Sequence, residues 1–301
     1  MEIFHEHAGS RCAPRRQPLF VLQGDSPDAA LINTGKGWKV LASKAYTFAR
    51  VQGVDTGGFY VAGPRESLDA SLYPWGWEGL DFDASTWPDA APLVQQFASP
   101  VALARGTQSN GSGAEWQLVP RSIPQLEQAP TRFERVRRAS GVLVPGGFLE
   151  GRAPVVVPPR SKVSLLLDQG TLTIGYPVLT ASGGTGASAT VTYAEGLFDA
   201  AGHKGNRNEI EGKSIRGLRD TFRFDGGEKR RFQSLWLRAW RYVQVDIETA
   251  DEPLRLDNVT GIFSAYTMAN RCGPVSISRI GESSENGRCR ITDRPGGRRS
   301  A

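Results

Sequence analysis

The chain has 301 residues, enough for two ordinary domains or one large one, and 39% hydrophobic with 22% charged residues allows a packed core. No apolar run approaches the roughly 18 residues that cross a bilayer, and the N-terminus lacks the apolar segment of a signal peptide. The net charge of +5 does not indicate nucleic acid, because residues 267–301 alone hold seven arginines against three acidic residues. We therefore expect a cytoplasmic chain that binds neither membrane nor nucleic acid.

Four regions follow one another along the chain. Residues 1–17 are polar and unpatterned, and residues 18–153 hold short strand-like runs between Gly, Pro, Asp and Ser turns, which predicts a partial N-terminal β-sandwich module. A proline-rich linker opens residues 154–266, the clearest β region. Residues 267–301 contain no aromatic residue and no helical periodicity, so we expect a disordered tail, interpreted as a sequence that has moved out of frame. The predicted fold is all-β, with two jelly-roll or concanavalin-like sandwich domains.

Short runs in the second region have strand character. Val163–Leu167 is apolar, Thr171–Val178 alternates and Ala189–Tyr193 is rich in β-formers. The tripeptide Asp225–Gly227 separates residues 221–224 from 230–232, which predicts a hairpin, because glycine allows a positive φ without steric cost.

Residues 237–247 predict one long strand whose odd positions face inward. Its even positions carry Trp236, Arg238, Trp240 and Tyr242. Two interpretations stay open for this even face. It is either the second, buried face of a sandwich, or an exposed surface for a sugar ring or another domain, since aromatic rings beside a planar guanidinium suit both.

A second polar concentration lies in residues 205–220. Glu209 and Glu211 are two positions apart, hence on one face and roughly 7 Å apart if the chain is extended. Paired carboxylates carry out glycoside hydrolysis, but catalytic pairs flank the substrate from opposite sides. Ion pairs with Arg207, Lys213 and Arg216, or a solvated strand edge, are the alternatives, and they are favoured.

Other reactive groups are scarce. His203 is the sole histidine beyond the N-terminal residues, and the three cysteines lack metal-ligand spacing, so we expect neither a metal nor a cofactor. Trp75 and Trp77 flank a glycine and form a possible stacking platform for sugar, although an edge-strand anchor is the favoured interpretation.

Four motifs in order resemble bacterial α-L-rhamnosidases of glycoside hydrolase family 78. They are TYAEGLFD at 192–199, GNRNEIEGKSIRG at 205–217, DTFRFDGG at 220–227 and LWLRAWRYVQVDIET at 235–249. The resemblance is to the concanavalin-like sandwich that precedes the catalytic barrel of that family, and a weaker match extends towards residue 81. It implies inverting hydrolysis of terminal α-L-rhamnose by carboxylates of an (α/α)6 barrel. No catalytic residue of the family falls on this chain.

Three functional hypotheses follow. The favoured one is an accessory sandwich of a truncated rhamnosidase-like protein, inactive alone; the alternatives are a freestanding carbohydrate-binding module and one half of a split rhamnosidase. The expected partners are rhamnose-containing glycans or a catalytic barrel domain. The candidate residues for binding sugar or docking the barrel are Arg207, Asn208, Glu209, Glu211, Asp220, Trp236, Arg238, Trp240, Tyr242, Trp75 and Trp77.

Overall fold

The computed structural model describes residues 26–35, 37–51, 63–91 and 123–266, together with the single positions 20, 22 and 24. The polar N-terminus, the tail after residue 266 and the three cysteines lie outside the described residues, as do the expectations attached to them. Within the described part the chain is all-β, as predicted, and its only helical elements are two short 3-10 helices. None of its helices is both long and apolar enough to span a membrane.

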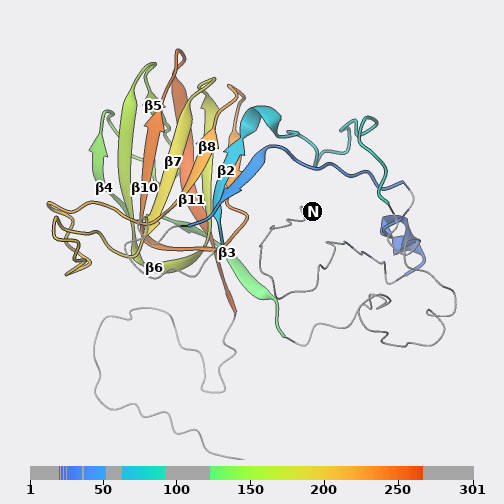
Figure 1. Ribbon diagram of the computed structural model, residues 1–301, viewed down its shortest axis with the longest axis horizontal. Helices are drawn as coiled ribbons and strands as arrows, with labels where there is room; N and C mark the ends of the chain where they lie inside the picture. Colours follow the sequence, from blue (N-terminus) through green and yellow to red (C-terminus); the bar gives the residue numbers. More distant parts are fainter. Residues whose placement is uncertain are drawn as a thin grey trace, which may run out of the picture.

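Eleven strands form the regular structure of these residues (Figure 1). In chain order the elements are η1 (Asp28–Ile32), β1 (Tyr46–Ala49), β2 (Arg65–Asp69), η2 (Ala70–Leu72), β3 (Leu126–Arg132), β4 (Arg135–Ser140), β5 (Val155–Val157), β6 (Lys162–Gly183), β7 (Ser188–Ala194), β8 (Leu218–Arg223), β9 (Arg230–Gln233), β10 (Arg238–Glu248) and β11 (Leu254–Tyr266).

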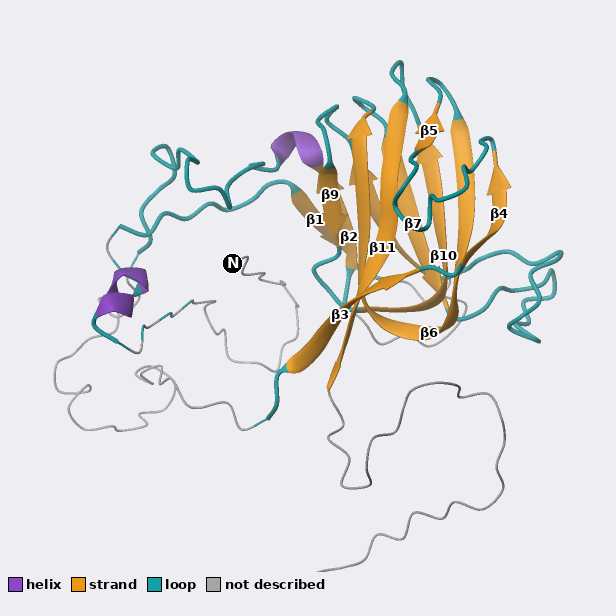
Figure 2. Ribbon diagram, turned by 180° about the vertical axis from the view of Figure 1, so that it is seen from behind, coloured by secondary structure: helices purple, strands orange, loops and turns teal. Residues whose placement is uncertain are grey.

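The longest strand, β6, connects two groups of strands. Its first half pairs with β10 and β4, and from β10 the sheet continues through β7, β8 and β2 to β1. Its second half pairs with β11 and β9, and β11 also pairs with β3 and β5. Figure 2 shows β6 curving beneath the other strands, so one continuous strand belongs to both groups.

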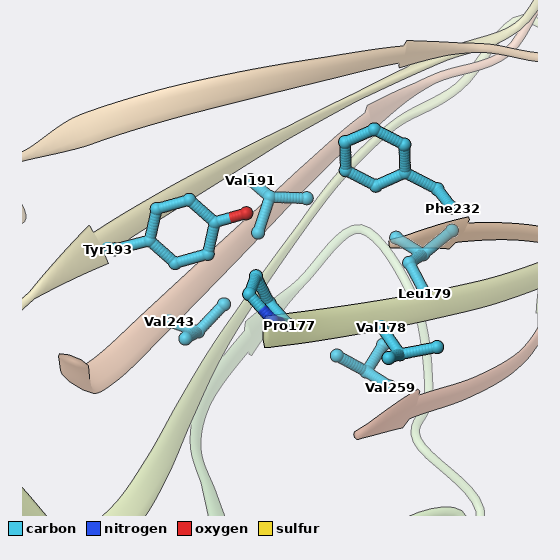
Figure 3. A pocket seen from close by; sticks show the side chains of 8 residues that line it. All are labelled: Pro177, Val178, Leu179, Val191, Tyr193, Phe232, Val243 and Val259. Atoms are coloured by element: carbon cyan, nitrogen blue, oxygen red, sulfur yellow. The ribbon is translucent and has the colours of Figure 1, made fainter. Parts of the chain in front are cut away.

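The two groups face each other across a shared apolar core. An internal cavity of about 10 Å³ is lined by residues of both groups (Figure 3). Val191, Tyr193 and Val243 come from the first group, and Leu179 and Val259 from the second. Side chains from two inner faces that meet in this way are typical of a β-sandwich, and a space of this size holds one water molecule at most.

The predicted boundary between residues 153 and 154 does not separate two sheets. Strand β4 pairs with β6, β3 pairs with β11, and β2 lies parallel to β8. Leu68 and Phe133, from before the boundary, are buried in the same core cluster as Val243. The described strands on both sides of the boundary therefore build one sandwich.

The predicted hairpin at Asp225–Gly227 does not form. Strand β8 pairs with β7 and β2, whereas β9 pairs with β6 in the other group. The turn is instead fixed by its own side chains: Asp225 accepts a hydrogen bond from the Gly227 N–H at 3.0 Å and a bidentate one from Arg230 at 2.7 and 3.0 Å. The glycines permit a tight turn, and the turn carries the chain between the layers rather than back along one sheet.

The long strand β10 does not keep one apolar face. Its register against β6 shifts between Trp240, opposite Thr173, and Tyr242, opposite Asp168. Before the shift, the even positions Arg238 and Trp240 are buried in the interior. After the shift, the odd positions Val243, Val245 and Ile247 are buried there instead. The β-bulge therefore reverses the alternation on which the single-face prediction depended.

Gly175 lies where β6 is flanked by both β10 and β11. A Cβ at this position would overlap the carbonyl oxygen of Ile262 on β11, which is fixed backbone. We expect Gly175→Ala to lower the free energy of unfolding by about 2 kcal/mol or more in chemical denaturation. Gly146→Ala is the matched control, because its Cβ would meet no atom within 4 Å. Equal stability of the two variants would contradict this packing.

Candidate functional site: an anchored loop

The GNRNEIEGKSIRG motif lies in a long connection between β7 and β8, residues 195–217, which we call the anchored loop. In Figure 1 it is the gold excursion at the left of the sandwich. It contains no strand, and its two arms are joined by reciprocal backbone hydrogen bonds of 2.8 Å between Phe198 and Ser214. A loop of this length needs anchors of another kind to hold one conformation.

The first kind of anchor is apolar. Leu197 and Ile210 of the loop are buried against Leu166 of β6 and Tyr242 of β10. These four residues form a cluster distinct from the main core, and Ile215 packs at its margin. The neighbours of Leu166 on β6 face the main core, so Leu166 itself points to the outer face of the sheet. The loop that packs on Leu166 therefore covers this outer face.

The second kind of anchor is a set of hydrogen bonds to the carbonyl oxygens of the loop. The Tyr242 hydroxyl donates to the carbonyl of Arg207 at 2.7 Å. Arg137 donates to the carbonyl of Asn208 at 3.2 Å, and Arg138 to that of Ile210 at 2.8 Å. These donors come from β4 and β10 and satisfy backbone groups that no strand pairs.

Asp168 holds Arg137, one of the two anchoring arginines, in place. Its carboxylate is fully buried and accepts hydrogen bonds from Arg137 at 2.9 Å, from Arg241 at 3.2 Å and from the Gly170 N–H at 2.8 Å. Burial on its own raises the pKa of Asp168, but the Gly170 N–H and the two guanidinium groups outweigh it, so the pKa lies below its usual value. Asp168 is therefore ionised at neutral pH and organises the base of the loop.

The crest of the loop presents polar side chains outward. Arg207, Asn208, Glu209 and Glu211 are all exposed. Glu209 lies 3.5 Å from the ammonium of Lys213, and Arg207 lies 3.7 Å from Glu195. The structure thus brings four predicted candidates together on one exposed, fixed loop. Because both glutamates are exposed and lie on the same loop, nothing here desolvates a general acid or places two carboxylates on opposite sides of a substrate.

Asp220 and Arg238 lie elsewhere, in the interior between the sheets. The Arg238 guanidinium donates to both oxygens of Asp220 at 2.8 and 2.9 Å, and to Glu66 of β2 at 2.9 Å. All three side chains are essentially inaccessible. We call Glu66, Asp220 and Arg238 the buried triad; in the described fold it joins three strands and faces no solvent.

The aromatic candidates separate in the same way. Trp240 and Tyr242 are fully buried, so the buried interpretation of the even face holds for them, whereas Trp236 is 46% exposed. Trp75 and Trp77 are half-buried. The guanidinium carbon of Arg230 lies 4.4 Å from the centroid of the Trp75 ring. The indole N–H of Trp77 donates a hydrogen bond to the Tyr73 hydroxyl at 2.9 Å.

Sequence reasoning missed the residues that hold these features in place. Asp168 directly follows the apolar run 163–167, and a charge at that point was a signal for a buried, paired carboxylate. Arg137 and Arg138 belong to the basic run at 135–138, a pattern that is typical of a solvated strand edge. Glu66 carried no signal, because its partners lie more than 150 positions away. Among the described residues no cluster of three or more His, Cys, Asp or Glu could hold a metal.

Comparisons with solved structures find partial similarities. A rhamnosidase of glycoside hydrolase family 78 from Bacillus sp. GL1 is 18% identical, covering 41% of this chain and 13% of its own, with a TM-score of 0.33. A native α-L-rhamnosidase from Aspergillus terreus is 16% identical, covering 68% and 19%, with a TM-score of 0.37. A pectin-binding carbohydrate-binding module is 12% identical, covering 47% and 94%, with a TM-score of 0.26.

The chain thus spans less than a fifth of the length of these two rhamnosidases. No protein-family model matches the sequence, and no curated protein does.

Proposed function

We propose that this chain is the accessory β-sandwich of a rhamnosidase-like, carbohydrate-active protein, and that the anchored loop is its contact with a catalytic barrel domain. The observation that carries the proposal is the loop itself. Its backbone is fixed by Tyr242, Arg137 and Arg138, while the side chains of its charged crest remain exposed. A fixed loop loses little conformational entropy on binding, which suits a docking surface.

The sequence resemblance supports the same assignment. The motif segment at 205–217 forms the loop, and the motif segment at 235–249 supplies Tyr242 beneath it. Two segments that were matched to the family separately therefore make one structural unit. The proposal assigns catalysis to the barrel, so the chain alone has no turnover.

The crest charges offer a direct test. We expect the chain alone to hydrolyse no aryl α-L-rhamnoside, and to bind a rhamnosidase barrel prepared without its own sandwich. In calorimetric titration, the double change Arg207→Ala and Glu209→Ala should weaken this binding at least tenfold, because it removes two exposed charges from the crest. Lys162→Ala is the control, since Lys162 is 78% exposed and pairs with Glu248 away from the loop.

Turnover by the chain alone, or equal binding by the crest variant and the control, would contradict the docking role. Activity that appears only after the barrel is added would instead identify a split rhamnosidase.

Glycan binding is a second candidate, favoured by Trp77. Its indole N–H is satisfied by Tyr73, and the half-buried ring has no other aromatic ring packed on it among the described residues. A ring held in this way can stack on the apolar face of a sugar. Binding of L-rhamnose in the millimolar range that is lost in Trp77→Ala and kept in the crest variant would favour this role over docking.

A further inference from the structure

Glu66 fixes a turn on the surface through its buried carboxyl. The turn consists of residues 234–237 and connects β9 to β10. Glu66 accepts hydrogen bonds from the N–H of Leu235 at 2.7 Å, from the N–H of Trp236 at 2.9 Å and from Arg238 at 2.9 Å. The turn carries Trp236, an exposed tryptophan whose ring packs on Gly63. An interior acid therefore positions an exposed aromatic side chain.

The charges around Glu66 do not balance. Asp220 of β8 shares the single guanidinium of Arg238, so two carboxylates face one cation in the buried triad. From β7 the Tyr193 hydroxyl adds a neutral group, and the 234–237 turn contributes only backbone N–H groups and the Ser234 hydroxyl, which binds the Trp236 carbonyl. With both acids ionised, the buried triad holds a net charge of −1, which is unfavourable away from water.

One proton relieves this imbalance. Burial and the neighbouring Asp220 raise the pKa of Glu66 from 4.5 to about 7, against the opposing effect of Arg238 and the two N–H groups. A protonated carboxyl keeps one O–H donor and gives up acceptor capacity. The N–H groups of Leu235 and Trp236 then no longer both meet a carboxylate oxygen.

We propose that Glu66 is a proton-controlled latch on the 234–237 turn. The ionised carboxylate holds both N–H groups and fixes Trp236 on the surface, and uptake of one proton loosens the turn. The latch lies on strands β2, β8 and β10, apart from the anchored loop, and it is independent of the docking role. It would make the surface around Trp236 respond to pH in the neutral range.

The latch also has a defined effect on stability. Because the folded-state pKa of Glu66 is raised above its unfolded value of 4.5, the folded chain binds a proton that the unfolded chain has lost. The contribution of Glu66 to stability is therefore complete below pH 4.5 and is lost as the pH rises through about 7.

The test follows the amide resonances of Leu235 and Trp236 in the ¹⁵N-labelled full chain between pH 5 and pH 9. We expect both to shift with one midpoint near pH 7, together with the indole N–H resonance of Trp236. Glu66→Gln should abolish the transition. Glu211→Gln, which removes an exposed carboxylate of the anchored loop, should leave it unchanged. A transition that persisted in Glu66→Gln would arise from another group and would overturn the latch.

Amide shifts that stay flat across this range in the unmodified chain would also overturn it. If Glu66→Gln does not fold, the carboxyl ¹³C resonance of Glu66 in the unmodified chain decides the question. A midpoint near pH 7 supports the latch, and a carboxylate that is ionised over the whole range from pH 5 to pH 9 overturns it.

Discussion

Replacing Arg238 with methionine is expected to lower the free energy of unfolding by about 3–5 kcal/mol. Methionine is apolar and leaves Asp220 and Glu66 buried without their shared cation, and a buried charge without a partner is among the most destabilising defects known. Chemical denaturation at pH 7, followed by circular dichroism, measures the loss.

Two further variants separate charge from size. Arg231→Met changes an exposed arginine of β9 and should alter stability by no more than about 0.5 kcal/mol. Adding Asp220→Asn to Arg238→Met should recover part of the loss, because it removes the unpaired charge; loss of Arg238 raises the pKa of Glu66 further, so Glu66 is protonated in this variant. Arg238→Met with unchanged stability would show that the triad does not carry the energy that its burial implies.

Asp168→Ala should both destabilise the chain and release the anchored loop. The expected loss is about 3 kcal/mol, the lower end of the range for breaking a buried pair, because the side chains of Arg137 and Arg241 are 24% and 13% exposed and can regain water. Without Asp168, Arg137 is no longer directed at the carbonyl of Asn208. The loop should then open locally, which limited trypsin digestion reports through faster cleavage after Lys204 and Arg207.

The matched variant for this experiment is Glu211→Ala. It removes an exposed carboxylate from the crest of the same loop and should change neither stability nor the cleavage rate measurably. If Asp168→Ala is cleaved no faster than Glu211→Ala, the Asp168–Arg137 pair does not anchor the loop.

The β class and the strands from β6 to β10 could be predicted from the sequence. Apolar alternation, β-branched residues and glycine-rich turns are local properties, and they identified β7 and β10 near their observed bounds, whereas β6 was predicted as two separate runs, 163–167 and 171–178. The position of the β-bulge at Arg241 could not be predicted, because it depends on which residues of β6 lie opposite. The shift exchanged the faces within one strand, burying Trp240 with Val243.

The candidate site was predicted only in part, because the sequence shows which residues are neighbours along the chain but not which distant strands supply their partners. Arg207, Asn208, Glu209 and Glu211 are adjacent in the chain, and they stayed together on an exposed loop. Arg238 and Asp220 were chosen as surface candidates, yet they pair in the interior with Glu66, from a strand far away in the sequence. Composition cannot distinguish a charged residue at the surface from one whose partner is supplied by a distant strand.

By itself, then, the sequence determined an all-β chain, because strand alternation and turn residues are local patterns, whereas the charged motif at 205–217, considered as an extended segment, proved to be a loop. Only the tertiary structure decided that residues before and after 153 build one sandwich, that Asp225–Gly227 crosses between layers, and that Asp168 and Glu66 are buried at its two polar centres. These outcomes depend on pairing between strands that are distant in the sequence, and such pairing is settled by the packing of the whole core rather than by any one segment.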